Sequence, residues 1–576
     1  MLVALGVVGA AFAAGEVHAA QLVHWAVPPM SNEMRLPDEE PTDGVKGGAL
    51  RVVACRDEFE PASFVMKSDA EVGKFLPVAR DLRTEDGHVL KAADIDLKVI
   101  KVWYQNGNCW YSYFNDTGLR LCPELLLNDE TLIKVDEERV ANYVRIDYKG
   151  GSVYRWVTPP AEIDPSFRKL SEPVSDAKTL QPAKLEKNRC KQFWVTFRIA
   201  RNQEPGLYRG AIDLMADGRK AGEIPVRLRV LPYVLPDPKT YYDTSADFYT
   251  MLYCVNGVKE LMAGNGADEK AAYEKLRRRL QNQVDHNVKY PLYFGLWKGW
   301  DGYDRVAKSL AIAKEVGMKL DPLFEAWSCE GGAQPYDGWG RGYFERRRQA
   351  EICKEAYGKI LGHNNLYPAG GEEPGLGRIL NSRNGWRSAH EAGQLVLCNG
   401  QDRRNYCGYQ DDFRVGGGFA DRRESDFMHR IKGKIGNYAG PHTGPENPDY
   451  MRRMHGINLY KKDYDMMYNY GYIEGDWNDL RSYCYRITLV YETKDGYIDT
   501  IPWEGIREGL DDIRYATLLM TLAERAVAEG KQKDVKKYYT GRKALQFLAN
   551  VDEEKCDLNA VRLEMIRHIE EVSHVL

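Results

Sequence analysis

Helical and strand-like segments alternate through the middle of this 576-residue chain, and this alternation restricts the possible folds more than any other feature. Leu276, Leu280 and Val284 recur every four residues, which indicates one face of a helix, and the short apolar run 288–294 follows them. The same order repeats several times further along the chain. Such alternation is typical of β/α units around a parallel sheet. We therefore expect a (β/α)8-type barrel over residues 237–530.

The residues before this region have a different periodicity. Residues 97–103 and 192–199 alternate between apolar and polar side chains, which indicates half-buried strands. Asp217 and Gly218 separate two further strand-like runs, and such a pair is typical of a hairpin turn. We therefore expect an antiparallel β-sandwich over residues 21–236, joined to the barrel by a proline-rich linker.

The two ends of the chain have patterns of their own. Residues 1–20 are mostly apolar and finish in small residues, which is typical of a signal peptide. The run is too short for a membrane anchor and contains Glu16 and His18. We therefore expect a secreted or periplasmic protein. Residues 531–576 have an amphipathic pattern and are expected to form a C-terminal helical segment.

Composition excludes several classes of function. The net charge is −4, and no basic stripe indicates nucleic-acid binding. After the N-terminus no stretch approaches the ~20 apolar residues that a membrane span needs. The 11 cysteines contain no C-x-x-C pair, and the 11 histidines contain no H-E-x-x-H motif. We therefore expect no catalytic metal and no cofactor, and we expect most cysteines to be buried as small apolar residues.

Two adjacent acidic residues are the first candidates for catalysis. Glu372 and Glu373 follow a short apolar run and lie between glycines and Pro374. The glycines permit a sharp turn, and proline keeps the preceding residue out of helical conformation. This pattern places the pair at the carboxyl end of a barrel strand, where active sites of this architecture collect. Two carboxylates there can act as charge stabiliser and general acid, whereas the alternative is a solvated acidic turn.

Five further residues are candidate substrate-binding residues. Tyr468 and Tyr470 lie at a strand end, Trp477 lies in the loop after it, Trp503 directly follows a strand-like run, and His442 lies in another loop. Aromatic rings stack on the apolar faces of sugars, but they also fill hydrophobic cores. A loop histidine is also commonly just solvated.

Charged residues on the long helix expected after residue 503 have a structural explanation. Glu504 lies three residues before Arg507, and Arg507 lies four before Asp511. Side chains three or four apart are neighbours on a helix surface, so the spacing indicates salt bridges and not a site.

Several segments, taken together and in order, resemble glycoside hydrolase family 123, including its uncharacterised DUF4091 relatives. The most specific is Trp-Glu-Gly-Ile-Arg-Glu-Gly-Leu-Asp-Asp-Ile-Arg-Tyr, while Gly-Glu-Glu-Pro-Gly stands where the family has Asp-Glu-Pro. The segments that carry the resemblance are 58–64, 205–210, 371–375, 444–448 with Arg452 and Arg453, and 503–515.

The resemblance implies a β-sandwich in front of a (β/α) barrel and β-N-acetylgalactosaminidase activity. It implies a substrate-assisted mechanism in which the acetamido group of the sugar replaces an enzyme nucleophile. Glu372 would stabilise the acetamido group, and Glu373 would be the general acid and base. The chain departs from the family in having Glu at position 372, where the family has Asp. One additional methylene displaces a carboxylate by about 1 Å, enough to alter specificity or activity.

These observations predict a secreted, retaining glycoside hydrolase that removes a terminal β-linked N-acetylhexosamine, with N-acetylgalactosamine favoured. Its partner would be a glycan or oligosaccharide. One alternative is a glycosidase that uses the same carboxylates on another sugar. The other is a non-catalytic glycan-binding protein on the same scaffold. The sequence predicts neither the oligomeric state nor the disulfide pairing.

Overall fold

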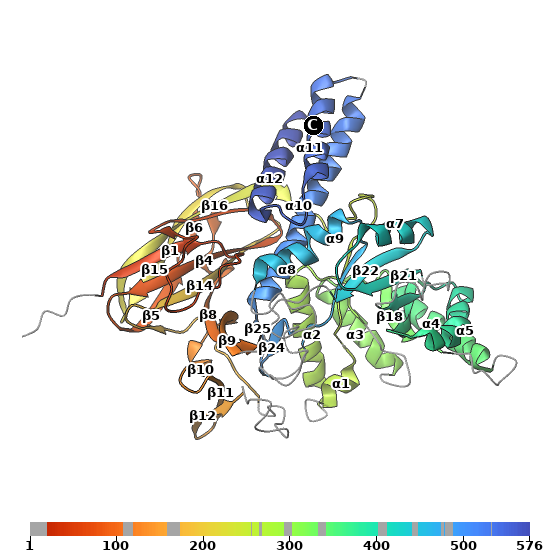
Figure 1. Cartoon of the computed structure of the whole chain (residues 1–576), viewed down its shortest axis with the longest axis horizontal. Helices are drawn as coiled ribbons and strands as arrows, with labels where there is room; N and C mark the ends of the chain where they lie inside the picture. Colours follow the sequence, from red (N-terminus) through yellow and green to blue (C-terminus); the bar gives the residue numbers. More distant parts are fainter. Residues whose placement is uncertain are drawn as a thin grey trace, which may run out of the picture.

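In the computed structural model the chain forms a β-rich N-terminal region, an α/β region and a bundle of C-terminal helices (Figure 1). The residues that the structure describes are 20–106, 119–157, 173–254, 256–263, 268–292, 302–331, 341–400, 412–439, 447–473, 477, 488–531 and 533–576. The expected signal peptide therefore lies almost wholly outside the described residues.

The N-terminal region contains a six-stranded antiparallel sheet with the order β2-β1-β4-β14-β8-β9. Its strands are β1 (Leu22–Val27), β2 (Val45–Lys46), β4 (Glu58–Ser68), β8 (Ile95–Asn106), β9 (Leu119–Leu127) and β14 (Cys190–Ile199).

A second sheet has the order β13-β5-β15-β16-β3, with β6 and β7 attached to it. Its strands are β3 (Leu50–Arg56), β5 (Val72–Ala79), β6 (Leu82–Arg83), β7 (Val89–Leu90), β13 (Ala183–Leu185), β15 (Gly206–Ala216) and β16 (Arg219–Val234). β15 and β16 form the expected hairpin, and Asp217 and Gly218 in its turn have φ values of 47° and 81°. A positive φ at both residues suits the tight turns that join twisted strands.

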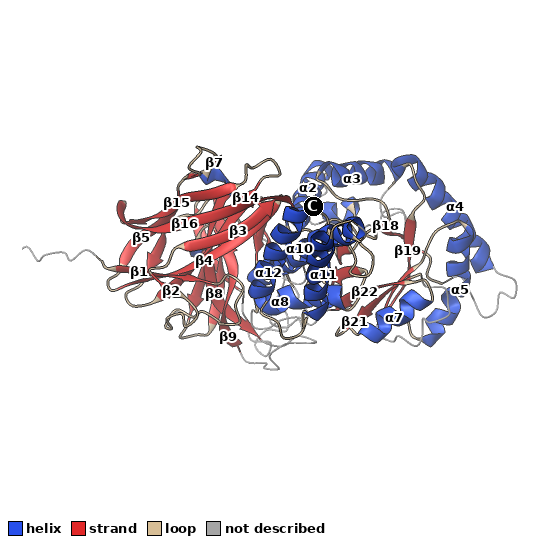
Figure 2. Cartoon of the chain, turned by 90° about the horizontal axis from the view of Figure 1, so that it is seen from above, coloured by secondary structure: helices blue, strands red, loops and turns tan. Residues whose placement is uncertain are grey.

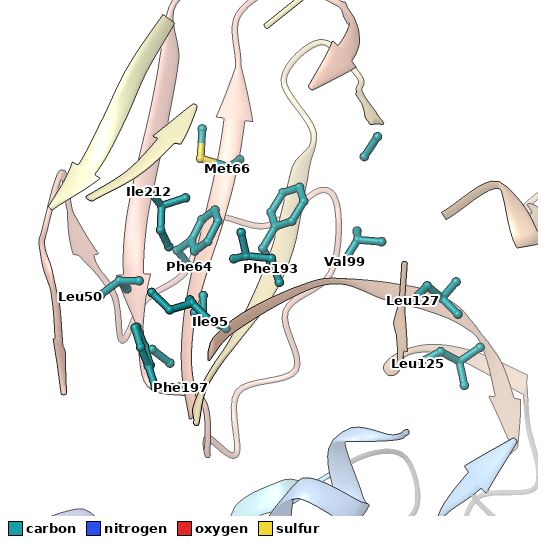
Figure 3. Packing of buried hydrophobic residues seen from close by; sticks show 14 of the residues in the cluster. Leu50, Phe64, Met66, Ile95, Val99, Leu125, Leu127, Phe193, Phe197 and Ile212 are labelled. Atoms are coloured by element: carbon teal, nitrogen blue, oxygen red, sulfur yellow. The ribbon is translucent and has the colours of Figure 1, made fainter. Parts of the chain in front are cut away.

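The two sheets share one hydrophobic core (Figure 3). Phe64 from β4 and Phe193 from β14 stack with their ring centroids 5.2 Å apart. Leu50 from β3 and Ile212 from β15 belong to the same buried cluster. The expectation of a largely antiparallel β region is confirmed, with β3 and β16 as a parallel pair that the sequence did not predict. A small third sheet consists of β10 (Ile133–Asp136), β11 (Ala141–Tyr148) and β12 (Gly151–Trp156), and the short 3-10 helices are η1 (Ala92–Asp94) and η2 (Glu130–Leu132).

The second region is a seven-stranded parallel sheet with the order β17-β23-β22-β21-β20-β19-β18. Helices curve around the outside of this sheet (Figure 2). The strands are β17 (Tyr249–Leu252), β18 (Leu323–Ser328), β19 (Leu366–Glu372), β20 (Leu397–Asn399), β21 (Phe413–Gly417), β22 (Lys434–Ala439) and β23 (Met466–Asn469). The helices are α1 (Val258–Ala263), α2 (Glu269–Asp285), α3 (Tyr303–Glu315), α4 (Arg341–Leu361), α5 (Leu376–Glu391), α7 (Arg422–Arg430), α8 (Pro448–His455) and α9 (Ile457–Lys461).

The sheet curves until its two edge strands approach each other. The rings of Tyr249 from β17 and Phe324 from β18 lie 5.2 Å apart. The segment 288–292 occupies the space between these edges, because the Tyr290 N–H donates to the Thr250 carbonyl (3.0 Å) and Leu292 bridges to Phe324. The predicted alternation of helices and parallel strands is thus confirmed, and the closed eight-stranded barrel stays a prediction.

The C-terminal region corrects one sequence expectation. The strand-like run before Trp503 lies within the residues expected to form the barrel, but β25 (Tyr497–Asp499) is not part of the parallel sheet and pairs with β24 (Val490–Glu492) in a separate hairpin. The long helix α10 (Ile501–Gly530) begins directly after it, since the Thr500 side chain caps its N-terminus and proline occupies its first turn. The helices α11 (Val535–Asn550) and α12 (Leu558–Val575) then pack against α10.

A buried ion network fixes α10 to its neighbours. Arg562 from α12 contacts Glu508 and Asp512 on α10, with 2.6 Å and 2.7 Å between the charged atoms, and also Glu60 on β4 (3.2 Å). Arg452 from α8 pairs with Asp512 (2.7 Å). Salt bridges therefore do explain the charges of the 503–515 segment, although most join α10 to other elements.

Two helices come unusually close at glycines. A Cβ atom on Gly509 of α10 would lie 2.4 Å from the carbonyl oxygen of Arg452 on α8. A Cβ atom on Gly505 would lie 2.5 Å from the carbonyl oxygen of Pro448. Glycine at these positions lets the backbones of α8 and α10 touch, which brings the charged side chains of the network within reach of one another.

Candidate active site

Carboxylate, amide and phenol side chains from several parallel strands gather on one side of the sheet, with Glu325 in the middle of β18 and the others at or near the carboxyl ends of their strands. In an α/β barrel the carboxyl ends of all strands lie at the same end of the barrel, and catalytic groups occur there. The residues and their strands are Glu325 (β18), Glu372 and the following Glu373 (β19), Asn399 (β20), Tyr438 (β22) and Tyr468 (β23).

Packing around Gly370 sets the position of the Glu372–Glu373 pair. A Cβ atom on this glycine would lie 2.4 Å from the Cys398 sulfur, so no other residue fits between β19 and β20 without displacement. The Gly370 carbonyl accepts a hydrogen bond from the indole of Trp386 on α5 (2.8 Å). The strand is therefore held on both sides just before the acidic pair.

Glu373 is held by its backbone and by a phenol. Its φ of 40° lies in the left-handed region, which is unusual for a residue with a side chain. Its backbone N–H donates to the Asn399 carbonyl (2.9 Å), and the Tyr438 hydroxyl donates to its Oε1. The side chain is exposed to solvent, so a substrate oxygen can reach it.

Glu372 has a different set of partners. Its Oε2 accepts a hydrogen bond from the Asn399 amide nitrogen (3.0 Å), and its backbone carbonyl accepts one from Arg378 (3.2 Å). Part of the side chain is exposed, but its surroundings at the end of the sheet desolvate the carboxylate, and this is the main reason why its pKa is raised. The hydrogen bond from Asn399 lowers the pKa, and the charge of Glu373 raises it.

Glu325 is a third carboxyl group that the sequence did not predict. It is 2% exposed, and its Oε1 accepts hydrogen bonds from the Asn399 amide (3.1 Å) and the Tyr468 hydroxyl (3.4 Å). One amide nitrogen therefore joins Glu325 to Glu372. Burial, together with the charge of Glu372, raises the pKa of Glu325 to about 8. The signal available in the sequence was a single acidic residue inside the apolar run 323–327.

The predicted substrate-binding residues fall into two groups. Tyr468 lies in the site, buried, with its hydroxyl on Glu325. Tyr470 follows β23, is partly exposed and has its ring 4.9 Å from that of Tyr253. His442 lies outside the described residues.

The two tryptophans pack elsewhere. Trp477 is buried with its ring 5.2 Å from that of Tyr491 and belongs to the core cluster of the N-terminal sheets. Trp503 is fully buried in α10, where it stacks on His286 at 4.3 Å and donates to the Asn282 side chain (3.0 Å). Neither ring offers a face to a sugar next to Glu372, and we leave both out of the proposed site.

One group of side chains in the described part of the chain has the composition of a metal site. His286, Asp499 and Glu504 present ligand atoms within 4.8 Å of one another. They lie between α2, β25 and α10, and not at the strand ends. Glu504 already forms an ion pair with Arg507, so its charge is compensated. We assign no metal to this group.

No family model matches the sequence, and no curated protein matches it. The chain nevertheless has the fold of a glycoside hydrolase whose structure has been solved. That protein is a family 123 glycoside hydrolase from Clostridium perfringens, which aligns with a TM-score of 0.60 and 12% identity over 92% of this chain and 96% of its own. The resemblance that the sequence motifs indicated is thus confirmed at the level of the fold.

A second solved structure is more distant. It is the GH5_18 protein from Bifidobacterium longum subsp. longum, with a TM-score of 0.31 and 9% identity over 47% of this chain and 78% of its own. This similarity is too low to bear on the present protein.

Proposed function

We propose that this protein is a retaining glycoside hydrolase that removes a terminal β-linked N-acetylhexosamine, N-acetylgalactosamine above all, by substrate-assisted catalysis. The observation that carries the proposal is a pair of adjacent carboxylates at a strand end, each held by a different partner. Asn399 binds Glu372, and Tyr438 binds Glu373. The fold shared with a family 123 glycoside hydrolase supports the same assignment.

Each carboxylate has one role in this mechanism. The acetamido oxygen of the bound sugar attacks the anomeric carbon while the glycosidic bond breaks, and Glu373 gives its proton to the leaving oxygen. Glu372 accepts a hydrogen bond from the acetamido N–H and stabilises the positive charge that develops on the ring so formed. Glu373 then removes a proton from the water that attacks the anomeric carbon, which restores the acetamido group with retained configuration.

The hydrogen bond from Asn399 helps to explain how the site accommodates Glu372 where the family has Asp. Glu reaches further from the strand than the Asp of the family, but its Oε2 is bound back to the end of the neighbouring strand β20. This contact supports a pocket that is adjusted to Glu and not a site that has lost its stabilising group.

The proposed substrate is the non-reducing end of a glycan outside the cell. The Clostridium perfringens protein hydrolyses glycolipid glycans, so glycolipid head groups are one class to test. Export rests on the signal-peptide pattern of residues 1–20. Within the described residues, no helix is both long enough and apolar enough to cross a bilayer.

The direct test is hydrolysis of aryl β-N-acetylgalactosaminides and β-N-acetylglucosaminides by the wild type and by Glu373→Gln. Loss of the general acid should lower kcat/KM by roughly 10²–10⁴-fold for a phenol leaving group and much less for a nitrated phenol, which needs little protonation. Glu345→Gln, an exposed position on α4, is the matched control. A well-folded wild type that cleaves neither sugar would refute the proposal.

Substrate assistance is tested separately. A thiazoline that mimics the cyclic intermediate should inhibit the enzyme, and aryl glycosides without the acetamido group should not be cleaved. Rapid hydrolysis of an aryl β-galactoside would instead favour a glycosidase that uses the same carboxylates on another sugar.

A further inference from the structure

The local backbone of β18 presents Glu325 in an unusual way. Leu323 and Phe324 pair with successive residues of β19, but the register then shifts before Ser328. Such a bulge changes the direction of the side chains within it and is common beside active sites. Glu325 also has a φ of 51°, as unusual for glutamate as the positive φ of Glu373. Backbone strain is concentrated at active sites, so positive φ values at these two acidic residues support a functional role for both.

The hydrogen bonds of Glu325 are asymmetric. Its Oε1 accepts from both Asn399 and Tyr468, whereas its Oε2 takes part in no hydrogen bond among the described residues. An oxygen that accepts two hydrogen bonds has no room for its own proton. A proton on this carboxyl group therefore resides on Oε2, where it is a donor that needs an acceptor.

The charges around Glu325 favour its neutral form. Glu372 on β19 repels a charge on it, and no cation contacts it from β18, β20 or β23 within the described residues. Asn399 and Tyr468 are its neutral neighbours, and Tyr253 lies beyond Tyr468. The guanidinium group of Arg378, which lowers the pKa of Glu372, is engaged by Glu330 and by the backbone of residue 372.

We infer that Glu325 is a neutral carboxylic acid that donates a hydrogen bond from Oε2 to an oxygen of the bound sugar and, through Asn399, positions Glu372. The inference rests on the proposed function, because the sugar is the one whose acetamido group Glu372 stabilises. The sugar group that accepts this hydrogen bond would be an uncharged oxygen, such as a hydroxyl or carbonyl oxygen. It also leaves Glu372 as the ionised member of the bridged pair, as the mechanism requires.

Two substitutions separate this role from a merely structural one. Glu325→Gln keeps the length of the side chain and an N–H donor but cannot ionise, while Glu325→Met removes donor and acceptor. We expect Glu325→Gln to stay within about tenfold of wild-type kcat/KM below neutral pH, and Glu325→Met to lose roughly 10–100-fold there. Wild-type kcat/KM should also fall as pH rises through about 8, a transition absent from Glu325→Gln.

A readout without turnover keeps the inference distinct from the proposed function. Calorimetry measures binding of N-acetylgalactosamine to the wild type and both variants, with Glu345→Gln as control. Weaker binding by Glu325→Met, with binding retained by Glu325→Gln, supports the inference even in an enzyme that cleaves no aryl glycoside. Wild-type kcat/KM or binding in Glu325→Met would overturn it, and so would a transition near pH 8 that persists in Glu325→Gln.

Discussion

Glu325→Gln should make the protein more stable at neutral and alkaline pH. The carboxyl group is 2% exposed, and its pKa rises on folding from 4.5 to about 8. Below about pH 4 both the folded and the unfolded chain bind the proton, so the substitution changes little. Between the two pKa values only the unfolded carboxyl group ionises, so the wild type loses stability as pH rises and the variant does not.

The size of this effect follows from the shift. One pKa unit corresponds to about 1.4 kcal/mol, so the full shift sets an upper value of about 5 kcal/mol, reached near pH 8. Glutamine keeps an oxygen that can accept from Asn399 and Tyr468, which leaves the packing unchanged. A gain of roughly 2–5 kcal/mol near pH 8 is therefore expected, against almost none near pH 4.

Urea denaturation of the wild type, Glu325→Gln and the exposed control Glu345→Gln, each near pH 4 and near pH 8, measures the difference. The α/β region can be followed by circular dichroism. Equal midpoints for the wild type and Glu325→Gln at both pH values would refute the reasoning, because a carboxyl group that ionises freely in the folded state costs nothing.

Further predictions concern the helices and the general acid. Arg562→Met should destabilise the protein by about 3–5 kcal/mol, since it leaves buried carboxylates without their cation, whereas Arg567→Met on the exposed face of α12 should cost less than about 1 kcal/mol. Gly509→Ala should lower the free energy of unfolding by about 1–3 kcal/mol, because the added Cβ atom has no space between α8 and α10. A higher melting temperature would show that the two helices are not in contact. Gly358→Ala in the open part of α4 should be neutral or stabilising. Tyr438→Phe should lower kcat about tenfold and shift its pH optimum, and an unchanged pH profile would argue against contact between Tyr438 and Glu373, the proposed general acid.

The sequence predicted the parts of the site that local pattern determines. Glycine and proline around Glu372 and Glu373 marked a turn at a strand end, and the structure has that turn. The antiparallel strands, the parallel sheet and the terminal helices likewise follow from periodicity. Segment boundaries near residue 500 were harder to predict, because the β-branched residues Ile498, Thr500 and Ile501 suit a strand, whereas Thr500 caps a helix that has proline in its first turn.

Other parts depend on contacts between distant strands. Glu325 lies within an apolar run, and only the bulge in β18 and the neighbouring ends of β20 and β23 show that it belongs to the site. The two tryptophans show the opposite error, because the sequence pattern suggested them for the site and the structure places them elsewhere. Trp477 and Trp503 lie close in sequence to strand ends, but their rings fill cores at the junction with other regions. Spacing alone does not distinguish a ring that faces solvent from one that faces a core.

The contact between Glu60 and Arg562 also affects how the chain is made. These residues are 502 positions apart, one in an early strand and the other in the last helix. During synthesis the first sheet emerges long before the guanidinium group that compensates its carboxylate. The guanidinium group of the last helix therefore reaches Glu60 only when synthesis is complete, and we expect a chain that stops before α12 to leave this carboxylate without its cation.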